Sequence, residues 1–521
     1  MANKYDVIII GSGFGGAVTA CRLAERGQKV LILERGRRWD PKEYPREPTD
    51  AWIYDENQPE KYNGWLDFNF LGTSKMTVVT GAGVGGGSLV YANVSAIPPP
   101  EGFAKGWPPE IKYKDLLPYY KTVGDMLKVS KIPENQLTKH YQIVREAAEK
   151  AGFSDRFDRI ELAINFDPDF DVNARPYSED QTKYKENEFG VVQGTCVHLG
   201  NCDVGCQVRA KNTLDVNYLA VAEKKGADIR ALHMARYIEP ENNGYRVFYD
   251  EIKNDELVRG SEVAEKVILA AGSLGSTELL LRSRDQHKTL PNISRYLGCN
   301  WSSNGDFLTP AIHKHRDVSM WEGPTITCAI DFLKDPYEGQ RFVIEDGGGP
   351  NFLLNWINAE KARGEQVNLF IKELNEFLQG DEKEIMLWFA NGVDAANGTL
   401  VLRRQWYWPW KRRLHLLWEI EKSKLLFDTV FRMHKLLAEK TGGRVLESPL
   451  FKYFNLLITP HPLGGCNMGQ SAADGVVNHL GEVFGYPGLY VADGAIIPEA
   501  IGINPSRTIA ALAERIVEFM K

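Results

Sequence analysis

The segment that opens the chain limits the fold more than any other part of the sequence. Tyr5–Ile10 is an apolar run that predicts a buried β-strand, and Gly16–Arg26 is expected to be the helix after it. The turn between them reads GSGFGG, and a second predicted strand, Lys29–Leu33, ends at Glu34. The Glu34 carboxylate can accept hydrogen bonds from ribose hydroxyls. This order is typical of a Rossmann-like dinucleotide-binding unit, although it does not separate FAD from NAD.

Each glycine of this turn has a physical reason to be there. Gly11 permits a tight turn, Gly13 lets the backbone approach a pyrophosphate, and Gly16 allows the helix to pack closely on the strand. Phe14 and Gly15 lie in the same turn, so we expect them to bind the cofactor too. The helix N-terminus then directs its positive dipole end at the phosphates.

Length and composition narrow the class of protein. At 521 residues the chain exceeds one ordinary core, so two domains or more are expected. Hydrophobic residues make up 43% and charged residues 25%, as in globular proteins, and a net charge of −7 argues against a nucleic-acid partner. No apolar run is long enough to span a bilayer. Seven cysteines fit a reducing compartment, and no leader pattern precedes the first strand, so we expect a cytoplasmic protein.

Further strand–turn–helix units stand far apart in the chain. Lys266–Ala270 is a predicted strand followed by AGSLGSTELLLRS, and Gly488–Asp493 is a third such strand. Separated units of this kind predict one doubly wound, Rossmann-like α/β domain built from discontinuous segments. The run Pro98–Pro100 marks a boundary, and alternating segments such as Glu384–Phe389 predict a second, α+β domain with a mixed or antiparallel sheet.

A second glycine cluster, TGAGVGGGSLVYANVS, carries five glycines and no charge in a short loop. Either it is a flexible hairpin, or its backbone passes close to a flat object. Together IIIGSGFGG, GAGVGGGSLVYAN, HPLGGC and DGAIIPEAIGINPSRTIAALAER resemble the glucose–methanol–choline (GMC) flavin oxidoreductases. Within that family the chain is most similar to the cholesterol oxidase branch, which AKNTLDVNYL also resembles.

The resemblance implies two domains made of separate segments and a flavin cofactor. The FAD-binding domain would comprise residues 1–96, 194–300 and 460–521, and the substrate-binding domain residues 97–193 and 301–459. By the same resemblance, the residues that bind FAD would include Gly83, Gly87, Ser88, Asn93, Ala235, Asp493 and Asn504. No histidine or cysteine in GAGVGGGSLVYAN could tether the flavin, so we expect non-covalent FAD.

His461 in HPLGGCNMG and Asn504 in GINPSRTIAALAER are the candidate catalytic pair. Oxidising an alcohol needs a base, a hydride acceptor and a group that holds the oxygen. By the family pattern His461 is the base, FAD takes the hydride, and the Asn504 amide holds the substrate oxygen or the flavin edge. The alternatives are a core histidine with a satisfied ring, and an N-cap for the predicted helix Pro505–Met520. The dipole of that helix would favour the anionic reduced flavin.

Glu345 in RFVIEDGGGP resembles the glutamate with which cholesterol oxidases move a proton along the steroid ring. A buried acid beside a ring would have a raised pKa and could act as a catalytic base. The enzyme would then shift a ring double bond after oxidation. The alternative is a carboxylate at a strand end that faces water.

Cys196, Cys202 and Cys206 fall in one loop, CVHLGNCDVGC. Three thiolates at this spacing are enough to consider an iron–sulfur cluster, and cluster-bearing relatives of this family show a similar spacing. No fourth ligand stands nearby, so the alternative is a trio of small, partly buried thiols that pack on the FAD domain.

Trp406, Trp408 and Trp410 alternate between two basic runs. Alternation places three indoles on one face of an extended segment, which could contact a membrane surface transiently. The alternative is a packed sheet face in the substrate domain with a solvated basic turn.

These observations favour a flavin-dependent alcohol oxidase or dehydrogenase for a sterol or another bulky hydrophobic alcohol. Oxygen, an electron-acceptor protein or a quinone would receive the electrons. The alternatives are a dehydrogenase of sugars or small alcohols that uses the iron–sulfur cluster, a flavoprotein lyase without net redox chemistry, and a silent FAD-binding protein that contacts membranes. The presence of both His461 and Asn504 disfavours the last.

Overall fold

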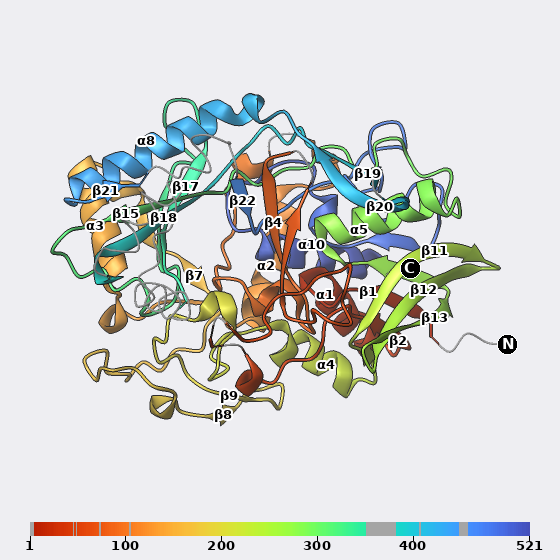
Figure 1. The fold of residues 1–521 in the computed structure, drawn as a ribbon, viewed down its shortest axis with the longest axis horizontal. Helices are drawn as coiled ribbons and strands as arrows, with labels where there is room; N and C mark the ends of the chain where they lie inside the picture. The colour runs from red at the N-terminus through yellow and green to blue at the C-terminus, as the bar shows by residue number, and fades with distance from the viewer. Residues whose placement is uncertain are drawn as a thin grey trace.

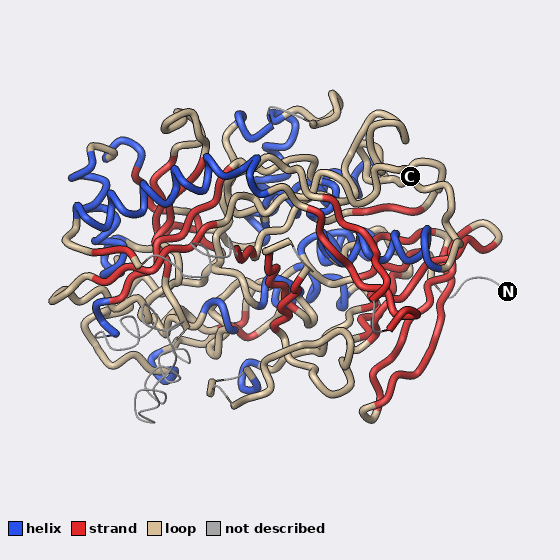
Figure 2. Tube along the Cα trace, turned by 45° about the horizontal axis from the view of Figure 1, so that its top comes forward, coloured by secondary structure: helices blue, strands red, loops and turns tan. Residues whose placement is uncertain are grey.

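The computed structural model describes residues 5–520, apart from 45, 48, 72–73, 104–105, 351–381, 406–407 and 447–456. Its two main sheets lie toward opposite ends of the long axis of the molecule, with a small sheet between them (Figure 1). Helices and long loops surround both sheets (Figure 2).

The first main sheet is parallel and five-stranded, with the order β10–β2–β1–β14–β23. Its strands are β1 (Val7–Ile10), β2 (Val30–Leu33), β10 (Asp228–Arg230), β14 (Lys266–Leu269) and β23 (Leu489–Val491). The strands β1, β2 and β23 are buried along their whole length, which suits apolar strands of a sheet covered on both faces. The chain segments that immediately follow β1, β2, β14 and β23 all line one cavity, as open α/β sheets place their ligands.

The second main sheet is antiparallel and six-stranded, with the order β21–β15–β18–β17–β16–β6. Its strands are β6 (Phe157–Arg159), β15 (Phe307–Ile312), β16 (Cys328–Asp331), β17 (Phe342–Gly347), β18 (Ile385–Gly392) and β21 (Arg444–Val445). The helices α3 (Lys139–Ala151) and α8 (Lys424–Lys440) pack on this sheet. Their apolar faces are buried, since both helices place buried residues three and four positions apart.

Smaller elements complete the fold. The helices α1 (Phe14–Glu25), α4 (Tyr218–Lys224) and α10 (Ser506–Phe519) contact one another, and α2 (Tyr113–Met126) contacts α10. A three-stranded sheet joins β11 (His233–Glu241), β12 (Gly244–Lys253) and β13 (Glu256–Ala264). Another joins β3 (Leu66–Phe70), β4 (Met76–Gly81) and β22 (Leu457–Thr459), and lies between the two main sheets (Figure 1). The remaining strands pair as β5 (Ser130–Lys131) with β7 (Glu161–Leu162), β8 (Lys185–Glu186) with β9 (Val192–Gln193), and β19 (Thr399–Gln405) with β20 (Trp408–Leu417).

The structure confirms the predicted fold class, with small differences in bounds. Helix α1 begins at Phe14 and not at Gly16, because Gly13 occupies the N-cap position and Phe14 and Gly15 form the first turn. The alternating segment predicted to be antiparallel is β18, which extends to Gly392. The predicted domain boundaries stay a prediction.

The strands β19 and β20, on either side of Trp406, form a two-stranded sheet apart from both main sheets. Within the described part of the chain they pair with each other alone, and α5 (Gly272–Leu281) packs against β19. Trp406 and the side chains of Trp408 and Trp410 lie outside the described part of the chain, so the membrane-facing patch stays a prediction. No helix among the described residues is long and apolar enough to cross a membrane.

Candidate active site

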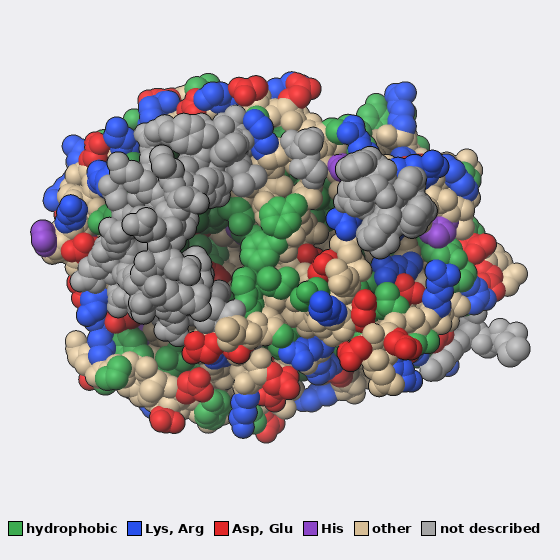
Figure 3. Space-filling model, viewed as in Figure 1, with side chains coloured by type: hydrophobic (Ala, Val, Ile, Leu, Met, Phe, Trp, Pro, Cys, Tyr) green, Lys and Arg blue, Asp and Glu red, His purple; other side chains and the backbone are tan. Residues whose placement is uncertain are grey.

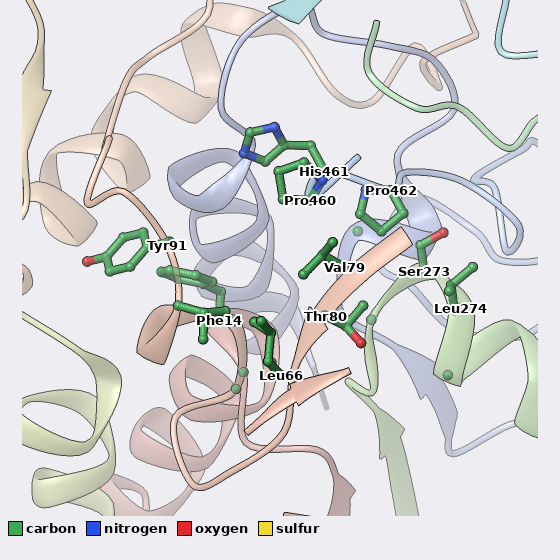
Figure 4. A pocket seen from close by; sticks show the side chains of 18 of the residues that line it. Phe14, Leu66, Val79, Thr80, Tyr91, Ser273, Leu274, Pro460, His461 and Pro462 are labelled. Atoms are coloured by element: carbon green, nitrogen blue, oxygen red, sulfur yellow. The ribbon is translucent and has the colours of Figure 1, made fainter. Parts of the chain in front are cut away.

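One large cavity, of about 670 Å³, is lined by residues of both main sheets. It extends from the GSGFGG turn to His461, and strands β15 and β18 of the six-stranded sheet contribute Leu308, Leu387 and Phe389 to its wall. One face of the molecule is hollowed near its middle, and hydrophobic side chains gather in the hollow (Figure 3). In Figure 4 the His461 imidazole projects into the space that Phe14, Tyr91 and Val79 also face.

The first glycine turn is closely packed on one side and open on the other. A Cβ at Gly15 would lie 1.7 Å from the Ala492 carbonyl oxygen, and one at Gly16 would lie 2.0 Å from the Gly11 carbonyl oxygen. A Cβ at Gly13 would meet nothing closer than 4.0 Å, so this backbone is open to the cavity. No side chain of the described residues caps the α1 N-terminus. Its free N–H groups and dipole form a site for a phosphate group.

Glu34 stands at the carboxyl end of β2 and lines the same cavity. Its Oε2 accepts hydrogen bonds from the backbone N–H (3.0 Å) and the hydroxyl (2.6 Å) of Ser12, and its Oε1 accepts one from Gly36 N–H (2.9 Å). These contacts fix the carboxylate while Oε1 keeps an acceptor position for a ribose hydroxyl. Sequence reasoning missed Ser12, which also accepts a hydrogen bond from Gly85 N–H at 3.1 Å and so ties the two glycine loops together.

The second glycine loop packs on the first. Gly87 lines the cavity, and a Cβ there would meet no atom within 4 Å. Gly83 and Ser88 lie behind the cavity surface, where the Ser88 hydroxyl accepts from Leu214 N–H and donates to the Gly85 carbonyl. Asn93 is fully buried, and neither polar atom of its side chain has a hydrogen-bond partner among the described residues. Its neighbours in sequence line the cavity, so a ligand edge there would satisfy the amide.

Two further predicted cofactor residues line the cavity. Ala235 lies in β11 at one end of it. The Asp493 carboxylate accepts hydrogen bonds from Gly272 N–H (2.8 Å), the Ser276 hydroxyl (2.5 Å) and Ala495 N–H (2.8 Å). Burial raises the pKa of Asp493 to about 6 in spite of these donors. The carboxylate thus joins the loop after β23 to the N-terminus of α5 at the cavity wall.

His461 is held by a buried carboxylate that the sequence did not indicate. Its Nδ1 lies 3.0 Å from Asp306 Oδ1. Asp306 is fully buried and also accepts hydrogen bonds from Asn391 Nδ2 (2.7 Å) and the Thr459 hydroxyl (2.6 Å). Because both carboxylate oxygens act as acceptors, the imidazole proton belongs on Nδ1. The unprotonated Nε2 makes no hydrogen bond to the described residues, and the ring lines the cavity.

Asn504 and Glu345 meet beside this pair. Asn504 Nδ2 donates to Glu345 Oε2 at 3.5 Å, while Asn504 Oδ1 and Glu345 Oε1 are buried without a partner among the described residues. Burial, and then the charge of Asp346, raise the pKa of Glu345 well above its usual value. Asn504 lines the cavity and Glu345 lies behind it. Pro505, not Asn504, occupies the N-cap position of α10, and no side chain in the described ranges caps that helix. The Asn504 amide instead donates to Glu345.

Asp346 points to the opposite face of β17 from Glu345, because side chains alternate along a strand. It accepts hydrogen bonds from His140 Nδ1 (2.6 Å), from Thr327 N–H (2.7 Å) and from Cys328 N–H (2.9 Å). Burial would raise its pKa, but the His140 ring and the donors from Thr327 outweigh burial, and the net pKa of Asp346 lies below its usual value. A fixed negative charge therefore lies one residue from Glu345.

The structure does not support the iron–sulfur site predicted on Cys196, Cys202 and Cys206. Among the described residues no group of three His, Cys, Asp or Glu side chains is arranged to hold a metal ion. The Cys206 sulfur instead accepts a hydrogen bond from Ala210 N–H at 3.2 Å. The described residues therefore offer no ligand set for the predicted cluster.

Most of the predicted cofactor-binding and catalytic residues thus line one cavity. The residues that line the cavity are Gly11, Gly13, Phe14, Gly15, Glu34, Gly87, Ala235, Asp493, His461 and Asn504. Side chains with buried polar atoms that have no hydrogen-bond partner among the described residues, those of Asn93, Glu345 and Asn504, lie in or beside the cavity wall. The helix N-terminus at the first glycine turn and the unpaired amide atoms at the cavity wall fit an elongated flavin dinucleotide.

Comparison with known proteins shows the family of the chain. Models of GMC oxidoreductases match residues 5–160 and 445–513. A cholesterol oxidase from Acinetobacter baumannii is 30% identical over 99% of this chain and 94% of that protein. A long-chain-alcohol oxidase from Arabidopsis thaliana is 24% identical over 98% of this chain and 66% of that protein. The crystal structure of pyridoxine 4-oxidase from Mesorbium loti covers 99% of both chains with a TM-score of 0.65 at 16% identity, which shows the shared fold.

Proposed function

The chain belongs to the GMC oxidoreductase family and is an FAD-dependent alcohol oxidoreductase, and from that premise we propose that it oxidises a bulky hydrophobic alcohol, with His461 as the base. The observation that carries the proposal is the hydrogen bond from His461 Nδ1 to the buried Asp306 carboxylate, which leaves Nε2 facing the cavity. FAD supplies the acceptor for the hydride.

The protein groups divide the work of alcohol oxidation. His461 Nε2 takes the hydroxyl proton as the C–H bond breaks, and Asp306 stabilises the imidazolium that forms. Asn504 presents its amide at the cavity wall, where it can hold the substrate oxygen or the flavin edge. The N-terminus of α10 faces the cavity beside Asn504 and favours negative charge there.

The apolar wall supports the substrate class. The side chains that form it are Leu308, Ile326, Leu387, Phe389, Ile458 and Pro460. Leu387 and Phe389 are two residues apart in β18 and therefore share its cavity face. A wall of this kind favours a large apolar body over a sugar, because burying each apolar Å² stabilises binding by about 25 cal/mol. The sterol and long-chain alcohols named for the relatives belong to this class.

Glu345 gives a second chemical step that a sterol substrate would reveal. Burial raises the pKa of Glu345 well above its usual value, which makes its carboxylate a stronger base, and the side chain lies next to Asn504 behind the cavity wall. We propose that this carboxylate takes a proton from the carbon between the new ketone and a ring double bond and returns it to the far carbon of that double bond, so that the double bond becomes conjugated with the ketone. Appearance of a conjugated enone from cholesterol would support this role, and its loss in Glu345→Gln with oxidation retained would assign it.

Anaerobic reduction of the flavin tests the proposal. Purified protein is mixed with cholesterol, 1-dodecanol or glucose, flavin bleaching is followed, and air is then admitted to test oxygen as the acceptor. We expect cholesterol or 1-dodecanol to bleach the flavin, and His461→Gln to slow bleaching by about two to four orders of magnitude with FAD still bound. His315, an exposed histidine, gives the matched control His315→Gln. Bleaching at the wild-type rate in His461→Gln would show that another group is the base.

A further inference from the structure

We propose that Asn304 is the positioning residue that fixes Asn504 relative to His461. The inference rests on the proposed function, since it concerns the two side chains assigned to the reaction. The segment Ser302–Asp306 contacts both of the loops that carry them. Its hydrogen bonds reach the Asn504 loop from Asn304 and the His461 loop from Asp306, only two residues away.

Asn304 makes three hydrogen bonds to the backbone that leads into Asn504. Its Oδ1 accepts from Ile501 N–H (3.1 Å) and Gly502 N–H (3.0 Å), and its Nδ2 donates to the Ile503 carbonyl (2.9 Å). The side chain is fully buried. One amide thus satisfies three consecutive residues immediately before Asn504, which leaves that loop little freedom to shift.

The other end of the segment holds the His461 loop. Ser302 and Leu463 exchange two backbone hydrogen bonds, of 3.0 and 3.1 Å. The Thr459 hydroxyl lies 2.9 Å from the Ser303 carbonyl oxygen and 2.6 Å from Asp306 Oδ2. The segment therefore contacts the His461 loop both before and after the histidine.

The segment itself is held in a tight conformation. Asn304 and Gly305 both have left-handed backbone angles, with φ of 54° and 62°. A Cβ at Gly305 would lie 2.4 Å from the Gly392 carbonyl oxygen at the end of β18. The Asp394 carboxylate accepts hydrogen bonds from both serine hydroxyls and from Ser303 N–H, at 2.8 to 2.9 Å. Because this short segment is fixed in this way, it holds the two loops at a defined position relative to each other.

Because Asn304 has a left-handed backbone conformation, its side chain can be removed without straining the backbone. Asn304→Gly removes the side chain at a position where glycine adopts φ of 54° without strain. Asn304→Asp keeps the two acceptor contacts to Ile501 and Gly502 and loses the donor to Ile503. Asn254 is exposed, has φ of 51°, and lies in the turn between β12 and β13, so Asn254→Gly is the matched control.

Amide hydrogen exchange of the FAD-loaded protein tests the contact without any substrate. We expect Ile501 and Gly502 N–H to exchange about 5- to 50-fold faster in Asn304→Gly, to remain close to wild type in Asn304→Asp, and to be unchanged in Asn254→Gly. Unchanged exchange in Asn304→Gly would overturn the inference. If Asn304→Gly does not fold, Asn304→Asp provides the test. Exchange of Ile501 and Gly502 N–H that is about 5- to 50-fold faster in Asn304→Asp than in wild type would overturn the inference.

Flavin reduction tests the consequence, with the panel alcohol that bleaches the wild-type flavin fastest. Asn304→Gly should slow bleaching by about tenfold, and should add nothing in an Asn504→Ala background, because it acts through that side chain. Additive losses, or wild-type bleaching in Asn304→Gly while Asn504→Ala is slow, would overturn positioning. Wild-type bleaching in Asn504→Ala itself would instead overturn the role given to Asn504 in the proposed function.

Discussion

Replacing Asp306 separates what its charge does from what its hydrogen bonds do. The carboxylate is fully buried and accepts from His461 Nδ1 (3.0 Å), Asn391 Nδ2 (2.7 Å) and the Thr459 hydroxyl (2.6 Å). In Asp306→Asn the amide oxygen can still accept from His461 and Asn391. The amide NH₂ can donate to the Thr459 oxygen, whose own proton turns to the Ser303 carbonyl at 2.9 Å. Geometry and tautomer are kept, and only the negative charge is lost.

The size of the effect follows from that difference. A hydrogen bond to a charged group contributes about 1.5–3 kcal/mol and a neutral one about 0.5–1.5 kcal/mol. Loss of the negative charge mainly destabilises the imidazolium that forms as the alcohol is oxidised. We therefore expect flavin reduction in Asp306→Asn to slow by about 5- to 30-fold. Asp306→Ala removes the acceptor from three buried donors and frees the ring to change tautomer. It should slow reduction by about a hundredfold or more and lower the free energy of unfolding by about 2–5 kcal/mol.

Stopped-flow bleaching of the flavin under anaerobic conditions measures the rates, and thermal unfolding measures stability. Asp125→Asn, at an exposed carboxylate paired with Lys121, is the control. Wild-type rates in Asp306→Asn would refute the role given to the charge. Equal rates in Asp306→Asn and Asp306→Ala would refute the role given to the hydrogen bond.

Three further predictions address the cofactor, the cysteines and pH. FAD should appear intact in the supernatant after acid or heat denaturation, and flavin that stays with the precipitate would contradict non-covalent binding. Serine at Cys196, Cys202 or Cys206 should change stability more than flavin reduction, and iron and sulfide per flavin should be near zero in anaerobically prepared protein. Burial raises the pKa of Asp493 to about 6. The folded apoprotein therefore holds a proton that the unfolded chain has already released. As pH rises from 4 to 6.5, the free energy of unfolding of the wild type should fall relative to that of Asp493→Asn, by on the order of 3 kcal/mol.

The local sequence pattern was sufficient to predict the strand, the glycine turn and Glu34 of the Rossmann-like unit. The apolar run, the glycine turn and Glu34 lie within about thirty consecutive residues, and each is required by a local constraint. Gly11 has φ of 95°, and Gly15 and Gly16 leave no space for a Cβ. Such constraints are visible in sequence because they act between neighbours in the chain. His461 and Asn504 could be identified from their motifs, by resemblance, and both lie at the cavity.

Tertiary structure alone decided what surrounds those residues. Asp306 meets His461 across 155 positions, and Asn304 reaches Ile501 across 197. Neither contact has a periodic or spaced signature, because an aspartate or asparagine in a loop is ordinary until folding buries it. The cysteine trio shows the converse. Its spacing resembled a ligand set, but in the described part of the chain the three thiols do not come together as a metal-binding group, and the Cys206 sulfur accepts a hydrogen bond from Ala210 N–H. Residue types are written in the sequence, whereas burial, partner and protonation depend on which distant segments fold together.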